Sequence, residues 1–567
     1  MALTNMRIFL KDCFLKYLKI FAWSLICISI HFFVGNFGGI YKYLTLHQDA
    51  LFSTCLDILF SLFVATVFLS LLFSVNIFIT KIFVLIANFV ALIYSYFVIH
   101  FGVVINQQIL ISALFFAEGN DVSSSFDFWI YIYCIPLFIA STLVINFFQK
   151  KLDIKSFVVI KKANLLNYFK NKLAVFCYSL ITIILLFLVI NFNIFLATHK
   201  LKTILEQLMP SFILTQSSEI KLMYKSSKNY DLEGYDQYQF KLKDNKKNKD
   251  PLIVVIFIGE SLRSDRLSIN GYERETTPKI QKIPNLFAFK NVLSCATTTA
   301  PSVLCMLTDE MQDQFINKFH DGSYQKKYSV AKVFKDLNFD VTVLSNANKD
   351  SGIYNYKNFH IPDKILTAHQ LRQKHMAKIN DFGDLILLEE INNKVEKNSL
   401  YVLGTRGSHR EYYSNYPRQY AKFEPDLGNS IEEINNSYNN TVVYFDIFMD
   451  KLVSKLKNEN AIIFYSSDHG ESLGENNVFL HGLPLDIAPK EQRNIPMIIW
   501  MSDKYIAQNT DQFNALKHNH KLHQANKLEV KHDHLFFTIV GCVNFKSSKI
   551  KDSLNLCKKQ NYNIPNL

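Results

Sequence analysis

Carboxylate and imidazole side chains follow two apolar runs of the sequence in an arrangement that suits a metal ion. Glu260 comes just after the run at 252–258, and Asp468 and His469 come just after the run at 461–465. Carboxylate oxygens and imidazole nitrogens are ordinary zinc ligands, and three protein ligands with one open position are typical of catalytic zinc. Taken singly, a Glu after a strand is most often a surface residue or a helix cap. Together the three residues predict a site for one Zn²⁺.

Two further histidines stand close to Gly residues after other segments of the chain. His409 follows Gly407 and Ser408 beyond an apolar run at 400–403, and His481 directly precedes Gly482. An imidazole changes its charge near neutral pH, so it can bind a phosphoryl group, ligate a metal or carry a proton. Both residues are therefore candidate catalytic groups for the same crevice.

A Thr-rich segment at 294–302 is the candidate source of a nucleophile. A hydroxyl is a weak nucleophile until a base or a metal lowers its pKa. If a helix begins within this segment, its free N–H groups can also hold phosphate oxygens. A turn whose threonines cap a helix is the alternative, and the sequence leaves it open.

The elements that position these residues alternate regularly after residue 250. Continuous apolar, β-branched runs are typical of strands covered on both faces, and they occur at 252–258, 340–344, 400–403, 461–465 and 496–500. Helical patterns lie between them at 329–337, 380–395 and 436–458. This alternation predicts a mixed, largely parallel sheet with helices on both faces. In such sheets ligands bind at the carboxyl ends of the strands, where the candidate residues stand.

The N-terminal third is of a different kind. Five apolar runs are long enough to span a bilayer, which takes about 17–25 residues, and they lie at 17–39, 52–75, 79–104, 127–148 and 174–197. The first could be a signal peptide, but no small-residue cleavage site follows it and four more runs come after. The sequence therefore predicts a five-helix transmembrane domain.

Charge in the loops predicts the orientation of these spans. The loop between the fourth and fifth runs contains Lys150, Lys151, Lys155, Lys161, Lys162, Lys170 and Lys172. The loop between the third and fourth contains Glu118 and Asp121 and no Lys or Arg. Because Lys and Arg stay in the cytoplasm, the N-terminus is expected inside and everything after residue 200 outside.

Cysteine usage agrees with an exported C-terminal part. Beyond the spans the cysteines are Cys295, Cys305, Cys542 and Cys557, an even number in two sequence-local pairs, as an oxidising compartment favours. Disulfides within each pair are a hypothesis at this point. The net charge of +12 invites a nucleic-acid interpretation, but no basic stripe interleaved with aromatic residues is present, so no nucleic-acid partner is expected.

At these residues the sequence resembles the lipid A phosphoethanolamine transferases of Gram-negative inner membranes, a family that includes enzymes of polymyxin resistance. The resemblance covers nearly the whole chain. Its matching segments are 258–261, 270–276, 295–305, 467–476 and 481–484. The most specific is the run Asp-His-Gly-Glu-Ser-Leu-Gly-Glu from Asp468, with His-Gly-Leu-Pro twelve residues beyond its His.

The resemblance implies an alkaline-phosphatase or sulfatase type of fold and a ping-pong reaction. Thr299, four residues after Cys295, is the implied nucleophile, and it is expected to bind Zn²⁺ together with Glu260, Asp468 and His469. The implied donor is phosphatidylethanolamine, which leaves a phosphoethanolamine-threonine, and the implied acceptor is a lipid A phosphate.

His409 and His481 are expected to bind the phosphoryl group, or a second zinc, and to pass protons. The implied location is a bacterial inner membrane, in contact with membrane lipids, with the catalytic domain in the periplasm. The implied consequence is weaker binding of cationic peptides such as polymyxin.

Several positions depart from the family's pattern. Arg410 and Glu411 follow His409, where the family has Gly-Pro, and Gly404 stands for a common His. Ser112 and Phe116 occupy positions of a usual Asn and Thr, and the family's later disulfides have no counterpart near 365–385 or 420–435. These substrate-facing differences bear on the acceptor and not on the chemistry.

The expected domains are therefore a transmembrane domain at 1–199, a polar, partly helical connector at 200–250 and a catalytic domain at 251–567. Alternative activities are phosphoethanolamine transfer to a core sugar or a periplasmic protein, phosphoglycerol transfer, and simple phosphate or sulfate hydrolysis. A non-catalytic membrane sensor is the alternative outside enzymes. The oligomeric state is not predicted, and a monomer is assumed.

Overall fold

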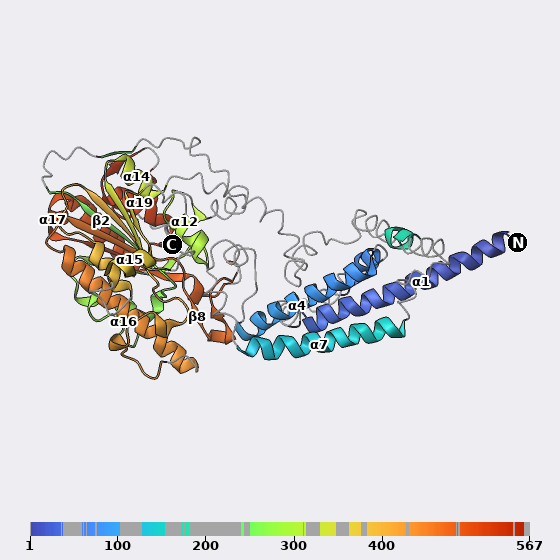
Figure 1. Cartoon of the computed structure of the whole chain (residues 1–567). Helices are drawn as coiled ribbons and strands as arrows, with labels where there is room; N and C mark the ends of the chain where they lie inside the picture. The colour runs from blue at the N-terminus through green and yellow to red at the C-terminus, as the bar shows by residue number, and fades with distance from the viewer. Residues whose placement is uncertain are drawn as a thin grey trace, which may run out of the picture. The chain divides into compact units, whose positions relative to one another are not determined.

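The structure of the protein is a computed structural model with two compact units (Figure 1). It describes residues 2–35, 76–101, 128–152, 250–309, 329–347, 362–375, 383–426, 430–483, 488–547 and 550–560, with shorter pieces that include 65–73 and 240–242. One unit consists of long apolar helices and the other is built on a β-sheet. Most of the expected connector at 200–250 lies outside the described residues.

Within the described residues, the N-terminal unit contains three helices that are long and apolar enough to cross a membrane. They are α1 (Ala2–Ile30), which continues into a π-helix at His31–Gly35, α4 (Ile77–Phe101) and α7 (Phe128–Lys151). They match the first, third and fourth expected spans. Half of the second expected span, at 52–75, lies outside the described residues. Most of the fifth, at 174–197, and most of the Lys-rich loop also lie outside them.

Side chains in this unit divide into an inward and an outward set. Trp23 is fully buried and packs on Phe73 with ring centroids 4.2 Å apart. On the outer faces of α4 and α7, Phe78 and Leu143 are 67% and 64% exposed. Lipid tails solvate such apolar faces as well as other side chains do, so this pattern fits helices that face lipid.

The C-terminal unit contains a seven-stranded sheet in the order β3-β10-β7-β2-β6-β4-β5. In that order the strands are Leu286–Leu293, Asn494–Met501, Ala461–Ser467, Ile253–Gly259, Ser399–Gly404, Asp340–Ser345 and Lys364–Leu366. The five strands from β7 to β5 pair in parallel, and β10 runs antiparallel to both β3 and β7. The prediction of a mixed, largely parallel sheet is confirmed.

Side chains of the central strand β2 alternate between two hydrophobic cores. Val254, Ile256 and Ile258 enter the core on one face, which α12 (Thr299–Met306), α14 (Val330–Asp336), α17 (Asp503–Gln508), α18 (Thr510–Gln524) and α19 (Asp533–Cys542) cover. Phe257 and its alternating neighbours enter the core on the other face, under α15 (Ala368–His375), a 3₁₀ helix at Asp384–Glu390 and α16 (Ile431–Leu456). Figure 1 shows this layering. Burial on both faces explains why β2 is a continuous apolar run.

The elements differ from the sequence predictions in three places. Strands β3 and β5 were not predicted; in β3 the polar pair Lys290 and Asn291 interrupts the apolar run. The helix expected at 380–395 is a 3₁₀ helix at Asp384–Glu390 in the described part of that range. Helix α16 begins before 436, because the Ser430 side chain accepts a hydrogen bond from Glu433 N and caps it.

A short two-stranded ribbon pairs the beginning of the sheet-containing unit, in chain order, with a segment near its C-terminal end. Strand β1 (Lys241–Leu242) pairs antiparallel with β11 (Phe545–Lys546), and Phe240 is buried in the α12-side core. Residues 240–242, expected within the connector, therefore pack as part of the α/β unit. A disulfide between Cys542 and Cys557 lies at the end of α19.

Candidate active site

The register of β2 and β7 sets the position of the candidate metal ligands. These strands are parallel neighbours in which Gly259 pairs with Ser467, so the next residues, Glu260 and Asp468, leave the sheet side by side. His469 follows Asp468. The three residues are buried, and one ligand atom from each lies within 4.8 Å of the others. The strand ends thus bring together the residues predicted from sequence to bind zinc.

The atoms of this cluster fit a divalent cation. Asp468 Oδ1 accepts hydrogen bonds from the backbone N–H groups of Ser261 and His469, at 3.0 and 2.7 Å. Asp468 Oδ2 is buried and has no hydrogen-bond partner among the described residues. A buried carboxylate oxygen without a partner is costly unless a cation faces it. The donor set is also the one that zinc prefers.

His469 is held in the form that a metal ligand needs. Its Nδ1 donates to the carbonyl of Gly470 at 2.9 Å, which leaves the lone pair of Nε2 directed at Glu260 Oε1, 3.3 Å away. Burial lowers the pKa of His469 to about 4, so the ring is neutral near pH 7. Burial, followed by the Asp468 carboxylate, raises the pKa of Glu260 well above its usual range. A cation between these carboxylates would favour the ionised form of Glu260 and the neutral form of His469, which are the forms that bind a metal.

Ser261 fixes the Glu260 side chain from the next position in the chain. Its φ of 58° is left-handed, an uncommon conformation for a residue with a side chain. In this conformation its hydroxyl donates to Glu260 Oε1 at 2.7 Å, and its carbonyl accepts from Tyr438 Oη at 2.6 Å. The α16 helix, which carries Tyr438, therefore holds the metal-binding turn in place.

Thr299 lies where a nucleophile next to a metal is required. It is the first residue of α12, and its Oγ1 is 3.1 Å from Glu260 Oε2 and 3.2 Å from His469 Nε2. The expected disulfide between Cys295 and Cys305 closes the segment that carries it. Because Thr299 begins a helix, the backbone N–H groups of Thr299 and Ala300 lie at the N-terminus of α12 beside its hydroxyl, whereas Pro301 has no N–H.

His481 stands over the same cluster on a hairpin of β8 (Ser472–Leu473) and β9 (Phe479–Leu480). Its ring centroid lies 4.1 Å from that of His469 and 6.0 Å from that of His409. Its Nδ1 is 2.6 Å from Glu471 Oε2, and Tyr412 Oη donates to Glu471 Oε1 at 2.7 Å. Burial disfavours the charged ring, but attraction to Glu471 and their hydrogen bond outweigh it and raise the pKa of His481.

His409 reaches the site on a turn that packs tightly on Glu260. Gly407 has a φ of +50°, and a Cβ there would lie 2.8 Å from the Glu260 carbonyl oxygen. The N–H of Ser408 donates to that same oxygen at 2.9 Å. Asp384 accepts from the N–H groups of Arg406 and Gly407, both at 3.0 Å.

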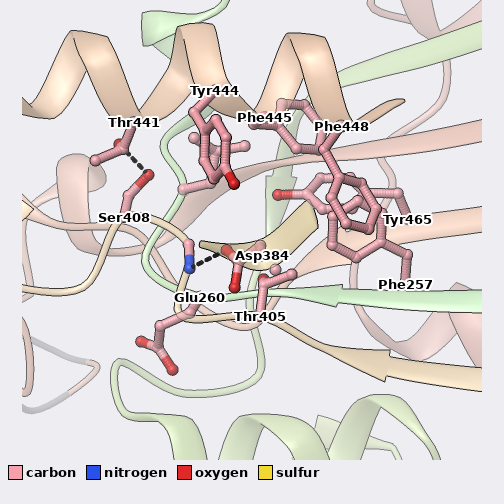
Figure 2. Close-up of a pocket in the computed structure, with 13 residues that line it drawn as sticks. Phe257, Glu260, Asp384, Thr405, Ser408, Thr441, Tyr444, Phe445, Phe448 and Tyr465 are labelled. Atoms are coloured by element: carbon pink, nitrogen blue, oxygen red, sulfur yellow. Dashed lines mark hydrogen bonds between the residues drawn. The ribbon is translucent and has the colours of Figure 1, made fainter. Parts of the chain in front are cut away.

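Figure 2 shows the small pocket behind this turn, with the Glu260 carboxylate pointing away from the aromatic rings of Phe257, Phe445, Phe448 and Tyr465. Ser408 Oγ and Thr441 Oγ1 lie 2.6 Å apart and tie the turn to α16. The aromatic side chains thus fill the space behind Glu260, and its carboxylate is left to face the metal cluster.

His532 is a buried residue of the site that sequence reasoning missed. Its Nδ1 accepts from the N–H of Cys295 at 3.0 Å, and its Nε2 donates to the carbonyl of Ser467 at 2.8 Å. It thereby joins the Thr299 segment to the turn of Asp468. Nothing in the sequence around His532 distinguishes it from the other histidines, because its partners are distant in the chain.

A model of the sulfatase family matches residues 252–545, just over half of the chain. The chain belongs to the sulfatase family.

Curated members of related families carry the name that the motifs predict. The chain is 35% identical over 327 residues to Kdo(2)-lipid A phosphoethanolamine 7''-transferase of Salmonella typhimurium, with 55% of each chain covered. It is 32% identical over 343 residues to phosphoethanolamine transferase EptA of Escherichia coli K12 (58% of this chain, 59% of that one). It is 31% identical over 329 residues to phosphatidylethanolamine transferase Mcr-1 of Escherichia coli (54% and 58%). The chain thus spans little more than half the length of the curated relatives it matches.

Solved structures show the same fold in this sulfatase-family chain. The integral membrane protein lipooligosaccharide phosphoethanolamine transferase A of Neisseria meningitidis matches with a TM-score of 0.73 at 22% identity, over 95% of this chain and 99% of that one. The soluble domain of that transferase matches with a TM-score of 0.50 at 28% identity, over 56% and 95%.

The sulfatase-type domain brings together the whole set of residues predicted for the site, namely Glu260, Thr299, His409, Asp468, His469 and His481. Of the two disulfides, Cys295–Cys305 borders Thr299, and Cys542–Cys557 fastens the C-terminal segment to α19. The arrangement combines a metal-type cluster, an adjacent hydroxyl and two further imidazoles. That combination is suited to phosphoryl transfer through a covalent step.

Proposed function

We propose that the protein transfers phosphoethanolamine from phosphatidylethanolamine to a phosphate of lipid A through a phosphothreonine intermediate. The observation that carries this proposal is the position of Thr299 Oγ1, 3.1 Å from Glu260 and 3.2 Å from His469 at the first turn of α12. The names of relatives at 31–35% identity supply the substrates. The proposed consequence is a less anionic lipid A that binds cationic peptides such as polymyxin more weakly.

Glu260, Asp468, His469 and Thr299 are the residues that would hold Zn²⁺. The ion would supply Lewis-acid chemistry, lowering the pKa of a bound hydroxyl and polarising a phosphoryl oxygen. The chain's own residues define the first step. The Thr299 hydroxyl lies 3.1 Å from Glu260 Oε2 and 3.2 Å from His469 Nε2, two groups that can accept its proton as the oxygen attacks phosphorus.

Attack forms a bond between Thr299 Oγ and the phosphorus of phosphatidylethanolamine and breaks the bond from phosphorus to the glycerol oxygen. Diacylglycerol leaves with a proton, for which His409 and His481 are the proposed donors. The N–H groups of the first turn of α12 stabilise the charge on the phosphoryl oxygens.

In the second step an oxygen of a lipid A phosphate attacks the same phosphorus, the bond to Thr299 breaks, and the threonine regains its proton. The two imidazoles again carry protons to and from the reacting oxygens. Glu471 orients His481 throughout, because its carboxylate is fixed by Tyr412 on the other side.

The proposed setting is a bacterial inner membrane, with five spans, the N-terminus in the cytoplasm and the catalytic domain in the periplasm. The three apolar helices, the Lys-rich loop between expected spans four and five, and the two disulfides support it. The proposed domains remain 1–199, 200–250 and 251–567, with 240–242 packed on the last.

One observation favours a second acceptor. The relative at 35% identity is named for position 7'' of Kdo(2)-lipid A, whereas the EptA and Mcr names give no position. A hydroxyl of a Kdo core sugar is therefore the alternative acceptor. The donor half of the reaction is the same in both cases.

Mass spectrometry of lipid A tests the proposal. The full chain is expressed in a Gram-negative host with unmodified lipid A, beside Thr299→Ala and the conservative Thr299→Ser. We expect a phosphoethanolamine-sized mass increase on lipid A with the intact chain and none with Thr299→Ala. An increase confined to the Kdo-containing fragment would shift the acceptor to the core sugar. No increase on either fragment, with the protein present and zinc-loaded, would refute both acceptors.

A further inference from the structure

A second cavity, lined mostly by polar residues, lies beside the His409 turn, and two arginines are among them. It has a volume of about 210 Å³, and its walls include Arg372 from α15, Arg406 from the turn after β6, and Ser414 and Asn415 from the segment after His409. None of the residues assigned above to zinc binding or proton transfer lines it. We call it the Arg372–Arg406 pocket.

Two cationic side chains, Arg372 and Arg406, line this pocket. Within the described residues, the Arg406 guanidinium donates to a neutral atom, Ser414 Oγ, at 3.4 Å, and to no carboxylate. The nearby carboxylate of Asp384 is occupied by other donors, namely the N–H groups of Arg406 and Gly407 and the side-chain amide of Asn346. Two guanidinium groups facing one cavity form a site that an anion stabilises.

The pocket shares its walls with the catalytic turn. The N–H of His409 donates to the carbonyl of Arg406 at 3.2 Å, and the side-chain amide of Asn415 donates to the carbonyl of His409 at 2.6 Å. Both peptide groups of His409 are therefore bonded to residues that line the pocket. A group bound there would therefore contact the residues that hold the backbone of His409, a proposed proton donor.

The size of the pocket limits what it can hold. Sites for whole drug-sized ligands measure about 300–1,000 Å³, and this cavity of about 210 Å³ is smaller. It suits one oxyanionic group of a larger molecule that extends into solvent. Phosphate and carboxylate both accept the paired N–H groups of a guanidinium.

We propose that the Arg372–Arg406 pocket binds a second oxyanion of the saccharide acceptor, a phosphate or a sugar carboxylate, while the acceptor's nucleophilic oxygen lies at Thr299. This inference rests on the proposed transfer to lipid A. It places an acceptor-specificity site on the turn at 406–415, which also carries Arg410 and Glu411.

The test separates the two half reactions of the full chain in membranes. Arg372→Gln and Arg406→Gln each remove one positive charge from the pocket, and Lys374→Gln removes one from the same helix outside it. Lys374 is the matched control, because its partner Glu390 keeps Lys364 and His375. Diacylglycerol release without acceptor reports the donor half, and phosphoethanolamine transfer to added lipid A reports the acceptor half.

We expect each pocket variant to raise the KM for lipid A about 10-fold, as loss of one charge-assisted hydrogen bond predicts. The rate of diacylglycerol release in the donor half should fall less, and Lys374→Gln should behave as the wild type in both half reactions. Two further acceptors identify the bound group, one without the second phosphate and one without the Kdo carboxylates. The difference in KM between the wild type and the variants should vanish with the acceptor that lacks the group bound in the pocket. A wild-type KM in both pocket variants, or equal losses in the two half reactions, would overturn the inference.

Failure of the proposed function gives a different result, in which the wild type releases diacylglycerol or nothing and modifies no lipid A. Binding of inorganic phosphate to the zinc-loaded chain then tests the pocket by itself. The inference holds if Arg406→Gln loses a phosphate site that Thr299→Ala and Lys374→Gln retain. It fails if all three variants bind phosphate as the wild type does.

Discussion

Two regions of the α/β unit build the proposed active site in different ways. The metal-type cluster of Glu260, Asp468 and His469 follows directly from the register of β2 and β7, and it is buried on every side. The His409 turn instead leaves the sheet after β6, is partly exposed, and depends on contacts from Asp384 and Asn415. Strand register fixes the chemistry of the first region, whereas long-range hydrogen bonds fix the second. The position of the second region therefore depends on side chains that are distant in the sequence.

The largest expected effect comes from breaking the strand-built cluster. Asp468→Asn keeps an oxygen for the two backbone N–H groups but removes the charge of the unpartnered Oδ2. We expect bound zinc to be lost and transfer to fall about 1,000-fold, since several kcal/mol of charge stabilisation are lost at 1.36 kcal/mol per tenfold. Metal analysis measures the bound zinc, and the lipid A assay measures the rate of transfer.

The control is Asp446→Asn, because Asp446 is also buried and accepts two backbone N–H groups, from Lys279 and Ile280, outside the cluster. It should keep its zinc. In the absence of metal the Asp468→Asn chain should unfold at a higher temperature than the metal-free wild type, because one of two adjacent buried carboxylates is gone. Equal zinc contents in wild type and Asp468→Asn would contradict the assigned ligand.

A smaller effect is expected from the residue that joins the cluster to the nucleophile. His532→Ala leaves the N–H of Cys295 and the carbonyl of Ser467 without their partner, at a cost of about 2–4 kcal/mol in the free energy of unfolding. Because Thr299 and Asp468 then lose their mutual support, we expect kcat to fall about 10- to 100-fold. Urea unfolding and transfer kinetics are the measurements.

His523→Ala separates positioning from stability. His523 is also buried and contacts two backbone carbonyls, of Leu528 and Lys290. Within the described residues, neither of these hydrogen bonds involves the Thr299 segment or the Asp468 turn. It should lose similar stability and keep its kcat. If the two variants lose kcat equally, His532 has no positioning role.

The His409 turn can be tested through the glycine that lets it approach Glu260. Gly407→Ala adds a left-handed strain and places a Cβ 2.8 Å from a backbone oxygen, whereas Gly271→Ala has a φ of +101° and no atom within 4 Å of its added Cβ. Strain should lower the free energy of unfolding of both variants by about 1 kcal/mol, and the total loss for Gly407→Ala should be about 1–3 kcal/mol. Only Gly407→Ala should slow transfer, because it moves His409. Equal activity in the two variants would show that the close packing of the turn is not required.

The smallest effect concerns the support of α15, which carries Arg372. Burial raises the pKa of Glu390, but hydrogen bonds from Lys364, Lys374 and His375 outweigh it and hold the pKa at about 2. A carboxylate with a lowered pKa stabilises the fold above its unfolded pKa, and this contribution is lost as pH falls from about 4.5 towards 2. Because the two lysines are half-exposed, we expect these ion pairs to contribute about 1 kcal/mol to the free energy of unfolding.

Thermal unfolding between pH 7 and pH 2 measures this contribution. Glu390→Gln should be less stable than the wild type at pH 7, and the two should converge at the acidic end. A constant difference at all pH values would mean that the ion pairs around Glu390 contribute nothing. The acceptor KM of Glu390→Gln should rise only slightly, since α15 keeps its buried Leu371.

The sequence predicted what depends on local pattern. The five central strands are β-branched runs, and Glu260 and Asp468 were identifiable because they directly follow two of them. Strand β3 was missed because Lys290 and Asn291 break its run, and the helix expected at 380–395 is wound as a 3₁₀ helix in its described part.

The rest depends on contacts between distant segments. His532 gains its role from Cys295 and Ser467, which are 237 and 65 residues away in the chain. The close approach of Gly407 to Glu260 likewise has no local signal, since the two residues lie on different strand ends. The five transmembrane spans and the connector stay predictions, although three of the spans match apolar helices of sufficient length.

The ribbon of β1 and β11 has a practical consequence for preparing the catalytic part alone. A fragment cut at residue 251, the boundary expected from sequence, would remove the partner strand of β11 and the buried ring of Phe240. It would uncover Phe545, which packs on Phe334 and Phe339 with centroids 4.9 and 5.9 Å away. An exposed strand edge beside aromatic rings promotes self-association. A soluble fragment for crystallisation should therefore start ahead of Phe240.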